Sequence, residues 1–316
     1  MTTPAIAAVI CTYDRYDLLP KAIESLSKQT LAADKFQIIV VDNSPDHAGS
    51  EREARAFRGH DNLQWIVERT SGLSNARNVG ARATTAPLIA FMDDDAVAAP
   101  VWLEAYIAAF DKFGTAAQAA GGRVDPIWGA PRPSWLPEEM LGYVSVVNWG
   151  GAARFADARE WVAGTNIAFR RDALLAAGGF HVGLGRNKTG HALLSNDEIE
   201  VLARLGETGG RLLYVPEAVV EHLVPPDRLT QSWFRRRVAW QAVSDYLQNP
   251  KALYENAPRY WADVADFLTR LPPKYRGPRG LYAEQSDPEL FRRQTSAIYN
   301  FTVATLAGYQ GLKDDQ

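Results

Sequence analysis

The sequence predicts an α/β fold with a mostly parallel central sheet that helices cover on both faces. In the first third of the 316 residues, short apolar runs of strand length alternate with segments whose apolar residues recur at helical spacing. The apolar runs also end in polar residues, and ligands of open α/β sheets gather beyond the carboxyl ends of the strands. We therefore expect one crevice lined by these strand ends.

The expected elements of this first part follow in order. Strands are predicted at residues 5–11, 36–41, 63–67 and 88–92, which are short runs of aliphatic and β-branched residues. Helices are predicted at residues 18–26, 73–83 and 100–110, and the last of these begins at Pro100, a residue that suits a first helical position.

Beyond Gly121 and Gly122 the sequence changes to loops rich in Pro, Trp and Gly. Regular elements are expected again at residues 161–169, 171–177, 197–207, 211–215 and 219–223, and a long helix at 230–248 with Thr230 as its cap. The remainder, 249–316, is interrupted by prolines and is predicted to be helical. We divide the chain into residues 1–125, residues 126–240 as a second subdomain of the same domain, and a C-terminal helical extension at 241–316.

Composition excludes several classes of protein. A net charge of -3 and a pI near 6.0 argue against a polyanion binder, so nucleic acid is not an expected partner. Cys11 is the only cysteine, which excludes an intramolecular disulfide and a cysteine-based zinc site and fits a cytoplasmic location. No apolar run approaches the roughly 18 residues of a membrane span. Any membrane contact is expected to be peripheral, on the inner face.

Asp93, Asp94 and Asp95 directly follow the predicted strand at 88–92. Three adjacent carboxylates repel one another unless a cation or hydrogen-bond donors offset their charge. Mg²⁺ and Mn²⁺ favour oxygen ligands and often bind through one or two carboxylates together with substrate phosphates. The run predicts a divalent metal and diphosphate site, and a solvated turn is the alternative.

Four segments carry a resemblance to a known family. Residues 9–15 (VICTYDR), 39–44 (IVVDNS), 72–78 (GLSNARN) and 90–95 (AFMDDD) have the order and spacing seen in the family 2 glycosyltransferases, and residues 164–171, 193–198 and 220–222 also match. Over roughly residues 5–240 the chain resembles these nucleotide-sugar transferases. The resemblance implies a GT-A fold with a Rossmann-like sheet, in which residues 1–125 bind the nucleotide sugar and residues 126–240 bind the acceptor and carry the base.

The resemblance also implies roles for single residues. Asp42 is expected to bind the base of the nucleotide, usually uracil, and Asp94 to face the ribose or the sugar. Asp95 is expected to hold the metal, Mn²⁺ or Mg²⁺, together with His222, although a lone histidine is more often structural. The remaining expected contacts of the nucleotide sugar are Thr12, Tyr13, Arg15, Arg77, Asn78 and Asp93.

Asp197 and Glu198 are the candidates for a general base, which must take a proton from the attacking acceptor hydroxyl. They stand at the start of a predicted helix, where the helix dipole favours their ionised form. Family members usually have Glu-Asp here, with Asp as the base, whereas this chain has Asp197-Glu198. Alignment places Glu198 in the base position, and Asp197 is the alternative. A simple helix cap is the structural interpretation of both.

Together these features predict an inverting, metal-dependent glycosyltransferase that uses a nucleotide sugar, most simply a UDP-sugar, and a saccharide or lipid-linked saccharide acceptor. The rivals are a nucleotidyltransferase on a similar scaffold and a catalytically silent glycan-assembly subunit. The glycine-rich segment 183–190 is interpreted as an acceptor-side loop. The aromatic and basic residues 233–240 are expected to pack the long helix against the catalytic domain. The alternatives are that an arginine of this cluster contacts the donor diphosphate, or that the cluster contacts the membrane interface.

Overall fold

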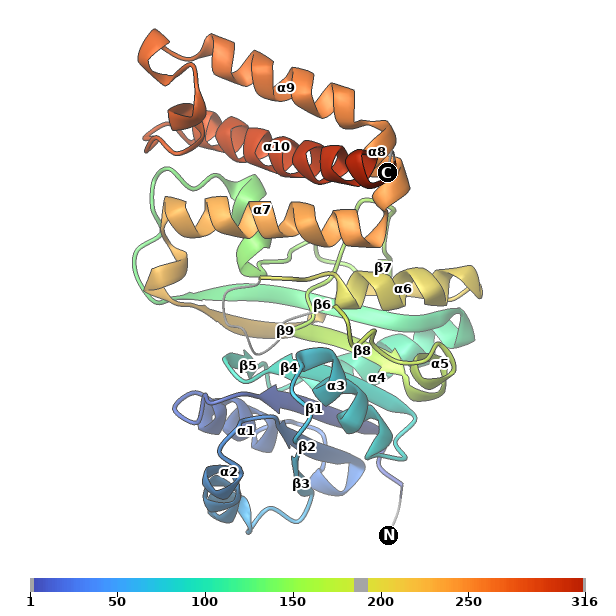
Figure 1. The fold of residues 1–316 in the computed structure, drawn as a ribbon. Coiled ribbons are helices and arrows are strands. Elements are labelled where there is room, and N and C mark those ends of the chain that lie inside the picture. The colour runs from blue at the N-terminus through green and yellow to red at the C-terminus, as the bar shows by residue number, and fades with distance from the viewer. Residues whose placement is uncertain (1–2, 185–192, 315–316) are drawn as a thin grey trace. The chain divides into compact units, whose positions relative to one another are not determined.

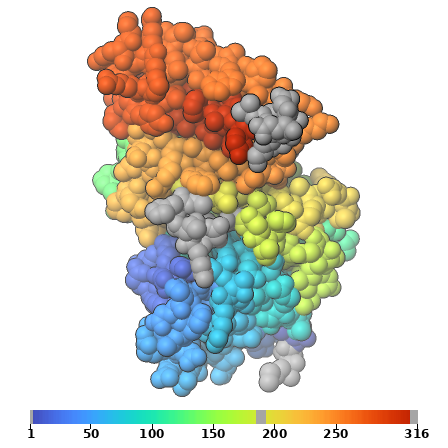
Figure 2. Space-filling view, in the orientation of Figure 1, coloured from blue at the N-terminus to red at the C-terminus, as the bar shows by residue number. Residues whose placement is uncertain are grey.

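The structure is a computed structural model that describes residues 3–184 and 193–314 (Figures 1 and 2). Most of the glycine-rich segment 183–190 therefore lies outside the described residues. The chain forms two compact units. The first contains residues 3–127, 145–184 and 197–223, and the second, called here the helical unit, contains residues 128–144, 193–196 and 224–314.

The first unit is built on a mixed sheet. Among the described residues, nine strands form it in the order β3-β2-β1-β4-β8-β6-β9-β5, with β7 paired to β9 (Figure 1). The pairs among β1 to β4 are parallel. The pairs β4–β8, β6–β8, β5–β9 and β7–β9 are antiparallel. The strands are β1 (Ile6–Thr12), β2 (Phe36–Asp42), β3 (Leu63–Val67), β4 (Leu88–Asp93), β5 (Ala96–Ala98), β6 (Ala117–Trp128), β7 (Arg154–Phe155), β8 (Asn166–Arg170) and β9 (Arg211–Val224).

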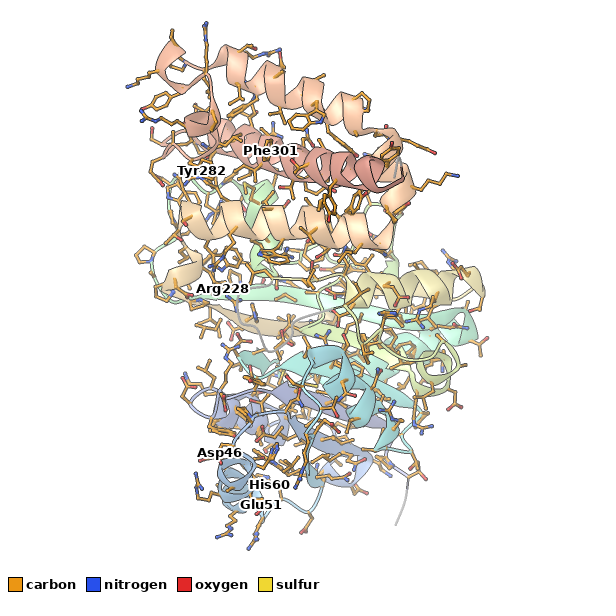
Figure 3. The ribbon with its side chains drawn as sticks, viewed as in Figure 1. Asp46, Glu51, His60, Arg228, Tyr282 and Phe301 are labelled. Carbon is orange, nitrogen blue, oxygen red and sulfur yellow. The ribbon has the colours of Figure 1, made fainter. Side chains whose placement is uncertain are left out.

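Helices cover both faces of this sheet. In β1, alternate residues point to opposite faces, so Ile6, Ala8 and Ile10 join one core cluster while Ala7 and Val9 join another. Helices α1 (Leu19–Ser27) and α4 (Trp102–Phe113) pack in the first cluster. Helices α3 (Leu73–Arg82), α5 (Arg171–Ala176) and α6 (Asp197–Glu207) pack in the second. Helix α2 begins at an Asp46 cap, labelled in Figure 3, whose Oδ1 accepts a hydrogen bond from the Gly49 amide at 2.9 Å.

The helices of this unit are α1 (Leu19–Ser27), α2 (His47–Ala54), α3 (Leu73–Arg82), α4 (Trp102–Phe113), α5 (Arg171–Ala176) and α6 (Asp197–Glu207), with 3-10 turns at Ala33–Lys35, Arg55–Phe57 and Gly114–Ala116. The predicted α/β class is confirmed. The four predicted strands and three predicted helices of the first third are present, with ends displaced by a few residues at most.

The second half of the sheet departs from the prediction at β6, which continues to Trp128 although loops were expected beyond Gly121 and Gly122. A Cβ atom on Gly122 would lie 1.9 Å from the Ala218 carbonyl oxygen, and one on Gly121 would lie 2.0 Å from a Val162 methyl. Glycine is needed here because neighbouring groups fill the side-chain space of a central strand.

Strand β9 is also longer than expected, because the two strands predicted at 211–215 and 219–223 form one. Pro216 lies between the residues paired with β7 and those paired with β5, so its missing N–H interrupts neither pairing.

The helical unit contains α7 (Gln231–Gln248), α8 (Pro250–Glu255), α9 (Ala257–Arg270) and α10 (Pro288–Asp314), with 3-10 turns at Glu138–Val144, Pro226–Arg228, Pro273–Tyr275 and Pro278–Leu281. Thr230 caps α7, as predicted, by accepting a hydrogen bond from the Trp233 amide at 3.2 Å. Within the described residues, no helix is both long and apolar enough to cross a bilayer.

The aromatic and basic residues of α7 are used largely in packing. Trp233 and Phe234 are buried, and Phe234 and Phe291 make edge contacts with Trp135 at 5.7 and 4.8 Å between ring centroids. Arg235 is also buried and donates hydrogen bonds to Gln231, Gln294 and the Ala283 carbonyl. Tyr282 and Phe301, which lie outside α7 in the same unit and are labelled in Figure 3, are exposed.

Candidate active site

Asp93, Asp95 and His222 form a cluster that could hold a metal ion. Each offers one ligand atom, and these atoms lie within 4.8 Å of one another. Strand β4 ends at Asp93, and the following turn leads into β5, whose Ala96 is in register with His222 of β9. The Leu223 amide also donates a hydrogen bond to the Asp95 carbonyl at 3.0 Å. The register of β5 against β9 thus brings His222 to Asp93, Asp94 and Asp95, which are called here the acidic turn.

Arg15 offsets part of the negative charge of this turn. Its guanidinium lies 3.1 Å from the Asp94 carboxylate and 2.8 Å from that of Asp95, and the His222 Nε2 atom lies 3.3 Å from Asp95 Oδ1. Burial raises the pKa of Asp94 to about 7 in spite of Arg15, and the charge of Asp95 adds to the rise. The carboxylates of Asp93 and Asp95 and the imidazole of His222 suit a divalent ion that prefers oxygen and nitrogen ligands.

The parallel register also brings the ends of β1, β2 and β4 together, as the sequence predicts. Thr12 is in register with Asp42, and Cys11 with Asp93. The Thr12 hydroxyl donates to Asp94 Oδ2 at 2.7 Å. Asp42 is fully buried, and its Oδ2 accepts a hydrogen bond from the Tyr16 hydroxyl at 2.9 Å.

Ser44 completes this corner of the first unit. Its backbone amide donates to Asp42 Oδ1 at 3.0 Å, and its hydroxyl accepts from the Asp14 amide at 2.8 Å. Asp14 has a φ of 53°, in the left-handed region, and Tyr13 beside it is 39% exposed. The hydrogen bond from Asp14 to Ser44 therefore holds the turn after β1, while Tyr13 in that turn is exposed to solvent.

Arg77 connects the acidic turn to the predicted catalytic carboxylates. It is buried on α3, and its Nη1 donates to Asp197 Oδ2 at 2.7 Å while Nη2 lies 3.6 Å from Asp93 Oδ1. The guanidinium also lies over the Phe180 ring, 5.3 Å from its centroid. The neighbouring Asn78 side chain binds both the amide and the carbonyl of Phe180, each at 2.8 Å.

Asp197 and Glu198 have opposite electrostatic environments. Burial alone would raise the pKa of Asp197, but the Arg77 charge and hydrogen bonds from Ser74 and Arg77 hold it below its ordinary value. Burial and the adjacent Asp197 charge raise the pKa of Glu198 above its ordinary value. Two adjacent carboxylates with pKa values pushed apart are typical of acid and base assignments in enzymes.

Sequence reasoning did not find every residue of this site. Tyr16 and Ser44 hold Asp42, and both lie in or beside the quoted motifs, so proximity in sequence was an available signal. Ser74 donates to Asp197 from the third of those motifs at 3.2 Å. Phe180 lies outside all of them, and no sequence signal pointed to it.

Removing the Arg77 charge is expected to destabilise the protein. Arg77→Met would leave the buried Asp197 without its cation, and breaking a buried ion pair in this way costs roughly 3–5 kcal/mol. Denaturant unfolding followed by circular dichroism measures the loss. Arg52→Met is the matched control, because Arg52 forms an exposed pair with Asp46 and should lose no measurable stability. Equal stability of both variants would contradict the prediction.

The chain is similar in sequence to known glycosyltransferases. The pattern described as Glycosyl transferase family 2 matches residues 7–174. The chain is 31% identical, over 96% of its length and 95% of the relative, to the Glucosyl-dolichyl phosphate glucuronosyltransferase of Haloferax volcanii. It is also 31% identical to the Validoxylamine A glucosyltransferase of Streptomyces hygroscopicus subsp. jinggangensis, over 34% of this chain and 25% of that protein.

Two solved structures share the fold. One is the mannosyltransferase PcManGT from Pyrobaculum calidifontis in complex with GDP-Man and Mn²⁺, with a TM-score of 0.54, 17% identity, and coverage of 97% of this chain and 74% of that one. The other is residues 1–349 of TarS from S. aureus in complex with UDP, with a TM-score of 0.54, 15% identity, and coverage of 97% and 91%. These similarities support the GT-A fold of the first unit and the presence of helices at the C-terminus.

Proposed function

We propose, from the premise that this chain belongs to glycosyl transferase family 2, that it is an inverting and metal-dependent glycosyltransferase. In this proposal it moves a sugar from a UDP-sugar to a hydroxyl of a lipid-linked saccharide. Glu198 is the general base, and Asp93, Asp95 and His222 hold the metal ion.

The connection made by Arg77 carries this proposal. One buried guanidinium contacts Asp93, in the cluster that could hold a metal, and Asp197, beside the proposed base. A site that holds a diphosphate through a metal ion at one end and a general base at the other contains the two functions that sugar transfer needs. Burial and the charge of Asp197 raise the pKa of Glu198, and this supports its role as a base, because a general base works best with a pKa near the operating pH.

The proposed reaction is a single displacement. The oxygen of the acceptor hydroxyl forms a bond to the anomeric carbon, and the bond from that carbon to the diphosphate oxygen breaks with its electron pair leaving on UDP. Glu198 accepts the hydroxyl proton and later releases it to solvent. Asp93, Asp95 and His222 would hold a divalent ion, and that ion would supply charge stabilisation for the departing diphosphate. One base and one displacement invert the anomeric configuration.

The donor and acceptor follow from separate observations. The Asp42 carboxylate, buried at the end of β2 and oriented by Tyr16 and Ser44, is the proposed contact of the uracil base. The name of the Haloferax volcanii relative describes a glucosyl-dolichyl phosphate and a glucuronosyl group. It supports a saccharide on a dolichyl phosphate lipid as the acceptor class and UDP-glucuronic acid among the donors to be tested.

A thermal-shift comparison of UDP, GDP, dTDP and CDP, each with and without Mn²⁺, tests the donor site. A nucleotide present at 100 times its dissociation constant stabilises the folded state by about 2.7 kcal/mol. We expect UDP with Mn²⁺ to raise Tm most, and we expect a chelator to reduce the rise that UDP gives. If no nucleotide gave a Mn²⁺-dependent rise, the proposed metal and donor site would be wrong.

Product analysis separates the proposed reaction from its rivals. Incubation with a UDP-sugar and a dolichyl phosphate saccharide should release UDP and extend the acceptor by one sugar. A nucleotidyltransferase would instead release pyrophosphate from a nucleoside triphosphate and a sugar phosphate, and a silent subunit would release neither.

A further inference from the structure

The residue before the proposed catalytic carboxylates has a left-handed backbone conformation. Asn196 has a φ of 75°, in the left-handed region, and its side chain is buried. Asparagine visits this region more often than most residues other than glycine, because its short polar side chain can form local hydrogen bonds. The chain passes directly from Asn196 into Asp197 and Glu198.

A polar stripe on α7 contacts the turn within the helical unit. Gln241, Ser244, Asp245 and Gln248 recur at positions i, i+3, i+4 and i+7, so they share one helix face. The Ser195 amide donates to the Ser244 hydroxyl at 3.1 Å. The Asn196 amide nitrogen donates to Asp245 Oδ1 at 2.7 Å and to Gln248 Oε1 at 3.2 Å, and Gln241 Nε2 donates to the Asn196 amide oxygen at 2.9 Å.

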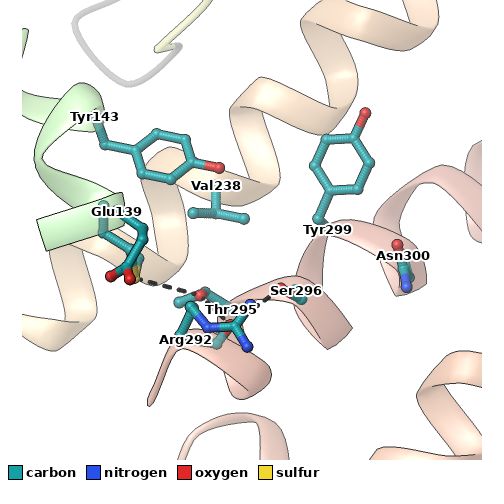
Figure 4. A pocket seen from close by; sticks show the side chains of 9 residues that line it. Glu139, Tyr143, Val238, Arg292, Thr295, Ser296, Tyr299 and Asn300 are labelled. Carbon is teal, nitrogen blue, oxygen red and sulfur yellow. Dashed lines mark hydrogen bonds between the residues drawn. The ribbon is translucent and has the colours of Figure 1, made fainter. Parts of the chain in front are cut away.

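Asp245 is the centre of these contacts. Its Oδ1 also accepts from Gln241 Nε2 at 2.7 Å, and its Oδ2 accepts from the Tyr299 hydroxyl of α10 at 2.7 Å. Tyr299 lines a cavity of about 300 Å³ in the helical unit, together with Tyr143 and Val238 (Figure 4). Burial and the hydrogen bond to Asp245 raise the pKa of Tyr299, so its hydroxyl remains a donor. Hydrogen bonds to an ionised acceptor are roughly twice as strong as neutral ones.

We propose that Asp245 is a positioning residue for the transfer reaction, because it holds the Ser195–Asn196 turn from which Glu198 follows. The inference rests on the proposed role of Glu198 as base. Asp245 contacts neither donor nor acceptor in this proposal and acts through the conformation of Asn196. A displacement of the base by 1 Å can lower the rate by about 10²-fold. The helical unit would then serve catalysis by fixing a backbone turn.

The experiment compares Asp245→Ala with Asp245→Asn in the full-length protein. Asp245→Ala removes the acceptor of three donors and should lower kcat by about 10-fold to 10²-fold, while the dissociation constant for UDP with Mn²⁺ changes less than about twofold. Asp245→Asn should restore most of kcat, because its amide oxygen still accepts from Asn196 and Gln241. Asp266→Ala, on an exposed face of α9 where Asp266 pairs with Arg270, is the matched control and should keep the activity of the unchanged protein.

A second measurement needs no substrate. Hydrogen exchange of the segment 193–201, followed by mass spectrometry, should be faster in Asp245→Ala than in the unchanged protein, with no change around residues 88–98. If the unchanged protein shows no transfer with any donor, the proposed function fails, and this measurement still decides whether Asp245 holds the turn.

Any of three results would overturn the inference. The first is a kcat of Asp245→Ala within threefold of the unchanged protein, and the second is hydrogen exchange of segment 193–201 that does not change. The third is a loss of UDP affinity as large as the loss of kcat, which would indicate a general structural role. If Asp245→Ala does not fold, Asn196→Gly replaces it, because glycine adopts the left-handed turn without strain but lacks the side chain that Asp245 holds. An unchanged kcat in that variant would equally contradict the inference.

Discussion

Glu198→Gln is expected to lower kcat by about 10²–10⁴-fold, because a positioned general base contributes about that factor and glutamine cannot accept the proton. The substitution keeps the size of the side chain and removes its charge. Binding of UDP and Mn²⁺ should be retained, since the proposed contacts of both lie on other residues. Steady-state kinetics with the donor and acceptor of the unchanged enzyme, together with a thermal-shift titration of UDP, measure the two effects separately.

The pH dependence of kcat gives the same assignment a second test. Glu198 accepts a proton only when it is ionised, and its pKa is raised by burial and by the charge of Asp197. As pH falls through this raised pKa, the ionised fraction falls, so kcat should decrease well above the pH at which an ordinary glutamate with a pKa of about 4.3 is protonated. A profile that stays flat down to pH 5 would contradict the proposed environment of Glu198.

Asp197→Asn tests whether the charge of Asp197 raises the pKa of Glu198. It removes the neighbouring charge that helps to raise the pKa of Glu198, so the acid limb of the profile should move to lower pH. It also takes away the anionic partner of Arg77, so stability should fall as well. If Asp197→Asn abolished turnover while Glu198→Gln kept kcat within tenfold, the two carboxylates would have to exchange roles.

The parts of the fold that the sequence predicts well are those with strong local signals. Strands β1, β2 and β4 are continuous apolar runs because both their faces are buried, and each ends in polar residues that meet at one edge through the parallel register. The meeting of Thr12, Asp42 and the acidic turn was therefore predictable. The divalent-metal site stays a prediction, and the Asp93, Asp95 and His222 cluster is compatible with it.

Other parts depended on contacts far apart in the chain. Strand β6 contains Gly121 and Gly122 because Val162 and Ala218 approach them closely, and neither neighbour is visible from the local sequence. Arg77 lies in a motif that resemblance connects with the nucleotide, but its contacts with Asp197 and Asp93 span 120 and 16 positions. The partners of such residues are set by tertiary packing, which local propensity does not encode.

Asp95→Asn is expected to remove most of the Mn²⁺-dependent effects on this protein. The substitution deletes one of the three charged or basic groups that could hold the ion and leaves the other two, Asp93 and His222, in place. A bound metal that stabilises a departing diphosphate contributes several kcal/mol to the transition state, and each 1.36 kcal/mol corresponds to a factor of ten. We therefore expect turnover to fall on the order of 10²–10³-fold.

The measurement has to separate loss of the metal from loss of the Arg15 contact, since Arg15 pairs with both Asp94 and Asp95. Unfolding in the presence of a chelator reports the loss of the metal-independent contacts of Asp95, which include Arg15 and His222. The additional rise in Tm with Mn²⁺ and UDP reports the metal. Asp125→Asn is the matched control, because Asp125 is a partly exposed acid of the same unit that pairs with Arg123. It should keep the full response to Mn²⁺. If Asp95→Asn responded to Mn²⁺ as strongly as Asp125→Asn, the acidic turn would not be the metal site.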